Sequence, residues 1–417
     1  MKSNFAGVHR WCNANDDEQG QTGFWLPSND IQAPMVSGGS GVDLEVEGFP
    51  LEGAETNSLG LYQGAIPPMC LTSLKLSSPA TPLTTQLGAL KGLVLQARRL
   101  KILHYRDRGQ GTCFRFEQGE RMPSLRSIVL ESYDWCHSSK QVESHWDFSQ
   151  AQSLSLISVP IFNFLISVNF NSLTNLQDFR VDDYSAHLPD RRREATEGLA
   201  ILIHQYVRRL VSLSMTCQIT HFPIDSILKH RGSLQVLRLR DHVGFGDEGK
   251  VCPTLHHSLL WRMAEEMKYV HTLELDMDPR AVDVFEFLQA LLRFRSLRTL
   301  IIHTQTHILP LAEDYTSRDI DYEACIAIFR HLWRSRQESD LACSPWKSIT
   351  INVGGWRQVL IRRLGAAWKE RNERGIFGER CFVLKNGAHG GFDLTEQSCV
   401  DCRSGRTNIG AGDYRAL

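Results

Sequence analysis

The stretch Leu297-Arg298-Thr299-Leu300-Ile301-Ile302 places apolar residues at positions i, i+3 and i+5 of a Leu-x-x-Leu-x-Leu pattern. Side chains alternate along a β-strand, so the last two apolar residues lie on one face of it. The first apolar residue lies at the preceding bend, where it can also point inward. The pattern therefore predicts a short strand with one buried face.

The same spacing recurs along most of the chain. Nine further units begin at Leu71, Leu100, Leu125, Leu154, Leu176, Leu210, Leu234, Val270 and Trp346. A single short strand cannot bury its apolar face alone, so a series of such units indicates that each one stacks against its neighbours. Successive units start 22 to 49 residues apart, which indicates an irregular array with insertions between some strands.

Several connections between these units are predicted to be helices. Thr81-Pro82 and Asp278-Pro279 each offer an N-cap followed by a proline suited to the first helical position, with apolar residues at helical spacing after them. Asp321 precedes a third apolar stripe that ends in arginines, as the helix dipole prefers. Further helices are expected to begin near Glu197, Thr254 and Trp356. Alternation of strand and helix implies parallel strands.

These patterns predict an α/β fold, an irregular leucine-rich-repeat solenoid shaped as a curved horseshoe, with parallel strands on the concave face and helices outside. We expect a poorly ordered N-terminal segment over residues 1–60, where Gly, Ser and acidic residues prevail. The solenoid is expected over residues 61–387, including a capping helix and a last strand at Cys381-Phe382-Val383-Leu384, and a flexible tail over residues 388–417.

The composition excludes several classes of protein. A net charge of -1 gives no electrostatic footprint for nucleic acid or an anionic membrane. The longest apolar stretch, Leu154 to Phe170, is interrupted by polar residues, so we expect a strand followed by a loop or short helix and no membrane span. No basic start precedes an apolar run, so no signal peptide is expected. The 11 cysteines are scattered and odd in number, which favours a reducing cytoplasmic or nuclear compartment.

Residues at i+4 and i+6 of each unit alternate away from the buried face and are expected to line the concave surface. Arg238 and Arg240 should lie beside Glu274 and Asp276 on the next strand, giving two opposite-charge pairs. Arg and aromatic side chains are typical of binding surfaces. The candidate partner-binding residues are Arg180, Asp182, Arg238, Arg240, Glu274, Asp276, His303, Tyr133, Trp135 and Phe245. The alternative is a solvated ladder of charges that neutralise each other, because exposed pairs contribute only about 0 to 1 kcal/mol.

Two motifs that can signal other chemistry are better explained as surface features. Gly244–Gly249 matches Gly-x-Gly-x-x-Gly, but its Asp247 and Glu248 would repel a pyrophosphate, so a surface loop is expected instead of a dinucleotide site. Cys399 and Cys402 have metal-ligand spacing but lack a second well-placed pair. No catalytic residues, metal or cofactor are predicted.

The series of imperfect Leu-x-x-Leu-x-Leu strands alternating with helices resembles the repeat part of fungal F-box proteins. Residues 354–384, which include Gly354-Gly355-Trp356-Arg357 and Glu379-Arg380-Cys381-Phe382-Val383-Leu384, are similar to the closing segment of one ascomycete group. In that family an N-terminal F-box docks to the Skp adaptor of a cullin ubiquitin ligase, and the repeats choose the substrate. Here the F-box itself is not recognisable, since Leu26-Pro27 continues as Ser-Asn-Asp-Ile.

The sequence thus predicts a non-catalytic protein-interaction module. The resemblance implies the substrate-recognition part of a ubiquitin-ligase adaptor, whose partner is a protein or a ubiquitylation substrate, with the Skp adaptor and cullin as further partners. A general scaffold, a paralogue that has lost its F-box, and an enzyme with an unrecognised site are the alternatives. An enzyme would need a deep pocket with convergent titratable residues in place of an open surface.

Overall fold

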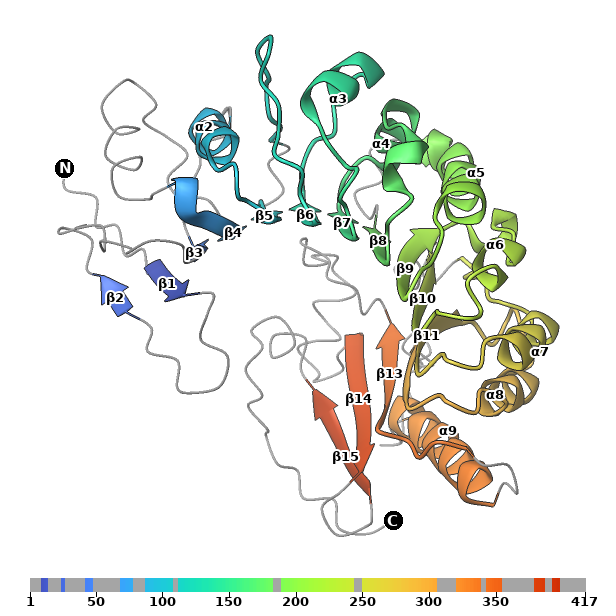
Figure 1. The fold of residues 1–417 in the computed structure, drawn as a ribbon. Helices are drawn as coiled ribbons and strands as arrows, with labels where there is room; N and C mark the ends of the chain where they lie inside the picture. Colours follow the sequence, from blue (N-terminus) through green and yellow to red (C-terminus); the bar gives the residue numbers. More distant parts are fainter. Residues whose placement is uncertain are drawn as a thin grey trace, which may run out of the picture. The chain divides into compact units, whose positions relative to one another are not determined.

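The structure is a computed structural model that describes residues 9–13, 24–26, 42–47, 68–77, 87–107, 112–182, 189–243, 250–305, 320–338, 343–354, 379–386 and 392–397. The chain divides into two compact units, Met1–Leu210 and Val211–Leu417 (Figure 1). Each unit is an α/β arrangement of strands that are mostly parallel.

Unit 1 contains a run of parallel strands preceded by an antiparallel pair. The parallel strands, each paired with the next, are β3 (Val42–Glu47), β4 (Leu71–Ser77), β5 (Ile102–Arg106), β6 (Ser127–Glu131), β7 (Ser153–Ile157) and β8 (Asp178–Asp182). Strand β1 (His9–Asn13) pairs antiparallel with β2 (Phe24–Leu26) and with β3. The α-helices are α2 (Gly88–Gln96), α3 (Ser139–His145), α4 (Ile161–Ser167) and α5 (Arg192–Ile201). Short turns of 3-10 helix lie at Pro68–Cys70, Phe170–Leu173 and Pro189–Arg191, and α5 continues into a π-helical turn, Leu202–Tyr206.

Unit 2 repeats the same plan and ends in antiparallel strands. Its parallel strands are β9 (Ser212–Cys217), β10 (Val236–Asp241), β11 (Thr272–Met277), β12 (Thr299–Thr304) and β13 (Ser348–Gly354). Strand β14 (Glu379–Asn386) pairs antiparallel with β13, and β15 (Phe392–Gln397) pairs antiparallel with β14. The connections carry a 3-10 turn (Ile219–His221) and helices α6 (Asp225–Leu228), α7 (His257–Glu266), α8 (Val284–Leu292) and α9 (Ile320–Gln337).

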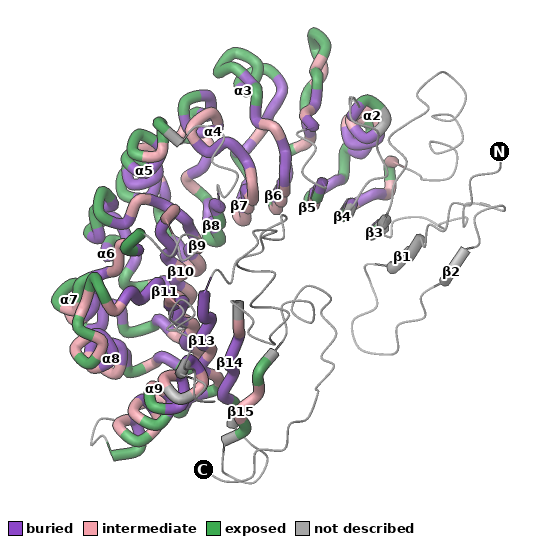
Figure 2. Tube along the Cα trace, turned by 180° about the vertical axis from the view of Figure 1, so that it is seen from behind, coloured by how far each residue is buried: buried purple, intermediate pink, exposed green. Residues whose placement is uncertain are grey.

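The apolar residues of the repeated pattern build the core of each unit. In unit 2, Leu237 pairs with Leu213 and Leu273, and Leu300 continues the row. All four are fully buried, at 0% exposure. Each such leucine contributes about 2 to 3 kcal/mol by leaving water. Within each unit the helices lie along one side of the strands (Figure 1), and buried residues occur along both the strands and the helices (Figure 2).

The strand predictions are confirmed except for one register. Nine of the ten predicted units place their i+3 and i+5 residues on the buried side of a strand. The unit predicted from Leu154 is wrong by three residues, because β7 aligns Leu154 and Leu156 with Ile128 and Leu130 of β6. The stretch after Ala151 carries apolar residues at both alternative spacings, so the pattern alone did not decide the register. The stretch at Cys381 is a strand as expected, but it is antiparallel to its neighbour.

Helix starts were predicted less well than strands. The N-cap of α8 is Asp283, whose carboxylate accepts from the Glu286 amide at 3.0 Å, and not Asp278. The structure begins α2 at Gly88 with Leu87 as N-cap, whereas Thr81 lies outside the described residues. Helix α9 begins at Ile320, one residue before Asp321. The predicted helix at Trp356 also lies outside the described residues.

Short strands occur inside both predicted terminal segments. Strands β1, β2 and β3 belong to residues 1–60, and β15 lies after Ala388. Strand β3, Val-Asp-Leu-Glu-Val-Glu, does alternate apolar and acidic residues, but the Gly- and Ser-rich composition around it was given more weight.

Candidate functional site

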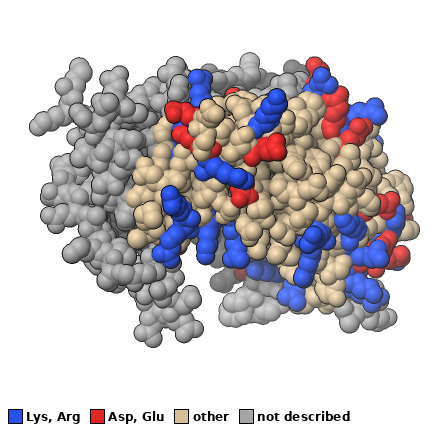
Figure 3. Space-filling model, turned by 45° about the horizontal axis from the view of Figure 1, so that its top comes forward, with Lys and Arg blue, Asp and Glu red and all other residues tan. Residues whose placement is uncertain are grey.

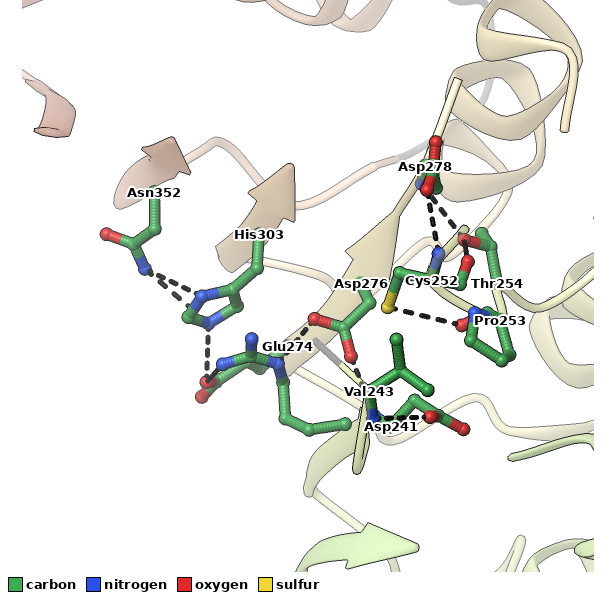
Figure 4. Close-up of polar contacts among 11 residues, drawn as sticks. Asp241, Val243, Cys252, Pro253, Thr254, Glu274, Asp276, Asp278, His303 and Asn352 are labelled. Atoms are coloured by element: carbon green, nitrogen blue, oxygen red, sulfur yellow. Dashed lines mark hydrogen bonds and ion pairs between the residues drawn. The ribbon is translucent and has the colours of Figure 1, made fainter. Parts of the chain in front are cut away.

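The candidate site is the surface of the strands that faces away from the buried leucines, which we call the strand face. In unit 2 it consists of two rows set by the parallel register. The i+4 row is Ser214, Arg238, Glu274, Ile301 and Thr350, and the i+6 row is Thr216, Arg240, Asp276, His303 and Asn352. The register thus brings predicted residues of three neighbouring strands together, and Asn352 of β13 lies beside them (Figure 4).

Glu274 on β11 is the centre of a polar network on this face. Its carboxylate lies 3.4 Å from Arg238 Nε and 3.8 Å from Arg240 Nη1, both on β10. From the other side, His303 Nε2 on β12 lies 2.8 Å from Glu274 Oε1. The predicted opposite-charge pairs between β10 and β11 are therefore present, and the network extends one strand further than predicted.

Asp276 forms the second half of the network. Its Oδ1 accepts from Arg240 Nε at 2.6 Å, and its Oδ2 accepts from the backbone amide of Asp241 at 2.7 Å. Both carboxylate oxygens are thus engaged with β10. A charge-assisted bond of this kind is stronger than a neutral one, and the surroundings exclude water from it.

The protonation states follow from burial and neighbouring charge. Burial by itself would raise the pKa of Glu274. The hydrogen bond from His303, the positive charge that His303 carries at low pH, and the charges of Arg240 and Arg238 lower this pKa to about 2. Burial and the charge of Arg240 lower the pKa of His303, despite the opposing effect of Glu274. At neutral pH Glu274 is therefore ionised and His303 is neutral.

A neutral His303 fits the hydrogen bonds around it. Its Nε2–H donates to Glu274, which leaves Nδ1 to accept from Asn352 Nδ2 at 3.4 Å. Asn352 is 4% exposed, and its Oδ1 is buried without a hydrogen-bond partner. The chain Asn352–His303–Glu274 thus connects β13, β12 and β11 through side chains.

The i+6 row is buried, which corrects the expectation that these residues are accessible to a partner. Arg240, Asp276 and His303 are exposed by only 6%, 2% and 4%. Their polar groups bond to one another across strands, so these residues stabilise the strand face. In unit 2 the accessible part of the strand face is the half-exposed i+4 row, in which Arg238 and Glu274 carry the charge.

In unit 1 this division is present on β8 but not on β5 and β6, where Arg106 is exposed and Glu131 is half-buried. Arg180 on β8 is exposed, whereas Asp182 at the end of the same strand is buried. Arg106 pairs with Glu131 at 3.0 Å on neighbouring strands. The corrected register of β7 places Ser155 and Ile157 on this face, where Ser158 and Pro160 had been expected.

Tyr133 and Trp135 do not belong to a binding surface. Both are at 0% exposure in an aromatic cluster, where Trp135 packs against Phe164 with ring centroids 4.9 Å apart. Their polar atoms are also satisfied, since the Trp135 indole donates to Ser167 Oγ at 2.8 Å. The sequence placed them on the surface because they follow a strand, but the segment turns back over the core at that point.

Two carboxylates that were not singled out from the sequence hold the connections beside the strands. Asp241 ends β10 and Asp278 follows β11, and both bind backbone amides of neighbouring connections. Asp241 Oδ2 accepts from the Ile219 amide at 2.9 Å, and Asp278 Oδ2 accepts from the Cys252 amide at 2.7 Å. An Asp just after an apolar strand was the available signal, because such a residue can hold the loop beside it.

Some predictions fall on parts of the chain that the structure does not describe. These are Phe245 with the Gly244–Gly249 motif, and the pair Cys399 and Cys402. Among the described residues, no group of three or more His, Cys, Asp or Glu side chains could hold a metal ion. Within the same residues, no helix has both the length and the apolar character needed to cross a bilayer.

The fold and the strand face define an α/β protein built from parallel strand–helix units that expose a row of side chains from consecutive strands. Comparisons of the chain with protein-family models, with curated proteins and with solved structures find no match.

Proposed function

We propose that this protein is a non-catalytic protein-interaction module. In this proposal its units form an irregular leucine-rich-repeat solenoid, with the strand face concave and the helices outside. The supporting observation is the i+4 row, in which consecutive strands present half-exposed side chains at a common register. Such a row gives a partner an extended surface whose side chains vary from strand to strand.

The charged part of this surface is preorganised for recognition. Arg238 is held 3.4 Å from Glu274, which is fixed in turn by Arg240 and His303. A partner that meets Arg238 therefore meets a side chain whose freedom is already restricted, and less entropy is lost on binding. The carboxylates of this network are engaged in bonds between strands, which favours an architectural role for them over acid–base catalysis.

We further propose that the partner is a protein, and that the module acts as the substrate-recognition part of a ubiquitin-ligase adaptor. This step rests on the resemblance of the repeat pattern to fungal F-box proteins. The thiols of Cys70, Cys113, Cys136, Cys217 and Cys343 form no disulfide bond, which is in keeping with a reducing compartment, the cytoplasm or the nucleus.

Affinity purification of the full chain from its own cells, followed by mass spectrometry, tests the proposal. Recovery of the Skp adaptor and a cullin together with further proteins is the expected result. Recovery of other partners without these two would reduce the role to that of a general scaffold. If no protein is enriched over an unrelated bait, the interaction module itself is disproved.

A variant of the strand face locates the binding surface. Arg238→Glu should weaken partner capture about tenfold, because it reverses one half-exposed charge beside Glu274. Lys140→Glu, an equal charge change on exposed α3, is the matched control and should leave capture unchanged. Arg240→Glu is unsuitable, since it would bury a third carboxylate beside Glu274 and Asp276. Unchanged capture by Arg238→Glu would place the binding surface elsewhere.

A further inference from the structure

The turns that lead from a helix into a strand carry a cluster of cations in unit 2. Lys268 lies before β11, Arg295 and Arg298 lie before β12, and Lys347 lies before β13. All four side chains are exposed. We call this set the basic edge, because it lies where the parallel strands begin, away from the strand face.

Hydrogen bonds between neighbouring turns hold the backbone of the basic edge in place. The Lys268 carbonyl accepts from Ser296 Oγ at 2.6 Å, and the Arg295 carbonyl accepts from the Ser344 amide at 2.8 Å. The Arg298 carbonyl accepts from the Lys347 amide at 2.7 Å. Neighbouring strands lie about 4.8 Å apart, so the four cations are forced into one small area.

The four cations are not neutralised by direct ion pairs with the described residues. None of the four cations forms an ion pair there, although the same unit contains pairs such as Arg231–Glu266 and Arg262–Asp225. A helix dipole accounts for Lys268, which follows the end of α7, but not for Arg298 and Lys347, which lie next to the first residues of strands. Ion pairs among the described residues therefore do not account for the four cations at this edge.

The opposite ends of the same strands show the contrast. At the ends of β10 and β11, Asp241, Asp276 and Asp278 each accept hydrogen bonds from backbone amides. Those acids stabilise the fold, whereas the cations of the basic edge do not. Figure 3 shows Lys and Arg side chains on one face of the molecule, some with Asp or Glu beside them and some without.

We infer that the basic edge is a docking surface for an acidic segment of a polypeptide. Two guanidinium groups are suited to planar carboxylates, which they can bind through two parallel hydrogen bonds. The cations come from three successive turns, so they span about 10 Å. Two or three acidic residues of an extended segment cover the same distance. The surface is distinct from the strand face and does not depend on the function proposed for it.

Charge balance favours a polypeptide over a nucleic acid as the ligand. The whole chain carries a net charge of -1, so it does not attract a long polyanion from a distance. A short acidic segment interacts with the local cluster alone, because charges beyond about 8 Å are screened at physiological ionic strength.

Fluorescence anisotropy on the full chain tests the inference. The probe is a fluorescein-labelled peptide of alternating Glu and Ser, and the expected result is binding at low salt that weakens as salt is added. Arg298→Glu with Lys347→Glu should weaken binding at least about tenfold. The neutral double variant Arg298→Gln with Lys347→Gln should show a smaller loss of peptide binding. It still tests the inference if the charge reversal disturbs folding.

Lys140→Glu with Arg330→Glu is the matched control, since it makes the same charge change at exposed helix positions outside the basic edge. This control should bind the peptide as the unaltered protein does. The inference is overturned by absent peptide binding, by equal loss in the control, or by unchanged binding in both edge variants. Tighter binding of a single-stranded DNA of equal charge, or of vesicles containing phosphatidylserine, would contradict a polypeptide as the ligand.

Discussion

Glu274 remains ionised inside a network of strand side chains, and this makes the stability of unit 2 depend on pH. The unfolded chain holds a proton on this group with a pKa near 4.5, whereas the folded protein lowers the pKa to about 2. The unfolded state therefore binds more protons as the pH falls below 4.5. The contribution of Glu274 is complete above that value and is lost as the pH falls toward 2.

We predict that Glu274→Gln lowers the free energy of unfolding by about 2 kcal/mol at pH 7, since a hydrogen bond to a charged group contributes about 1.5 to 3 kcal/mol. The difference between the two proteins should shrink steadily below pH 4.5, because the unaltered protein then loses the same contribution. Denaturant unfolding of both proteins across the pH range measures it. A difference that does not change with pH would show that the network does not hold Glu274 ionised.

His303 adds a second, earlier loss of stability. Its pKa is lowered in the folded protein from 6.5, so the unfolded chain takes up this proton first. The contribution is complete above about pH 6.5 and is lost as the pH falls below it.

Asp276 and Arg240 form the buried pair on which this network rests. We predict that Asp276→Ala costs about 3 to 5 kcal/mol, because it leaves Arg240 buried without its closest partner. The double variant Asp276→Ala with Arg240→Ala should cost less than the sum of the two single changes. Denaturant unfolding of the four proteins gives the coupling energy, and strictly additive losses would mean that the two side chains act independently.

At the scale of single elements, helix α8 shows what decides a helix start. Asp278-Pro279 carries the expected sequence signal, but Asp278 is engaged with the Cys252 amide and the Arg280 amide. The chain therefore turns once more before Asp283 caps the helix. The local pattern contained two acceptable caps, and a contact with a distant segment selected the second.

We predict that Asp283→Ala lowers the free energy of unfolding by about 1 kcal/mol, the usual cost of a lost N-cap. Asp283→Asn is the control, because an amide oxygen can still accept from the Glu286 amide, and it should cost much less. Urea unfolding compares the three proteins. Equal losses for the two variants would show that the side chain does not act as a cap.

The strands were predictable because their apolar period follows directly from a pleated backbone with one buried side. Leu237, Leu273 and Leu300 fall in register for this reason. The strand face was predicted in position but not in burial. The burial of Arg240 and His303 depends on partners on adjacent strands, and a single-strand pattern contains no information on how deeply such pairs lie. The predicted exposure of Tyr133 and Trp135 was wrong for a related reason, because contacts between residues distant in sequence determine the path of a connecting segment.

At the scale of the whole molecule, each strand is stabilised by the strands directly beside it. We predict that Leu300→Ala costs about 2 to 5 kcal/mol, because its fully buried side chain would leave a cavity. Amide hydrogen exchange should quicken most in β11, β12 and β13, and less in β9, as nearest-neighbour stacking requires. Equal acceleration in β9 and β12 would instead indicate that unit 2 unfolds as one cooperative body.

Two serines limit how this repeated architecture can change in evolution. Ser132 and Ser158 directly follow β6 and β7, and both adopt a left-handed backbone, with φ of 58° and 52°. Their amides bond to the end of the next strand, at Ile157 and Asp182 respectively. The chain thus leaves consecutive strands through the same tight bend. This backbone conformation is strongly unfavourable for β-branched residues. Substitutions at these two points are restricted to small or turn-forming residues, so a family grown from such repeats would vary its exposed row freely while these corners stayed nearly fixed.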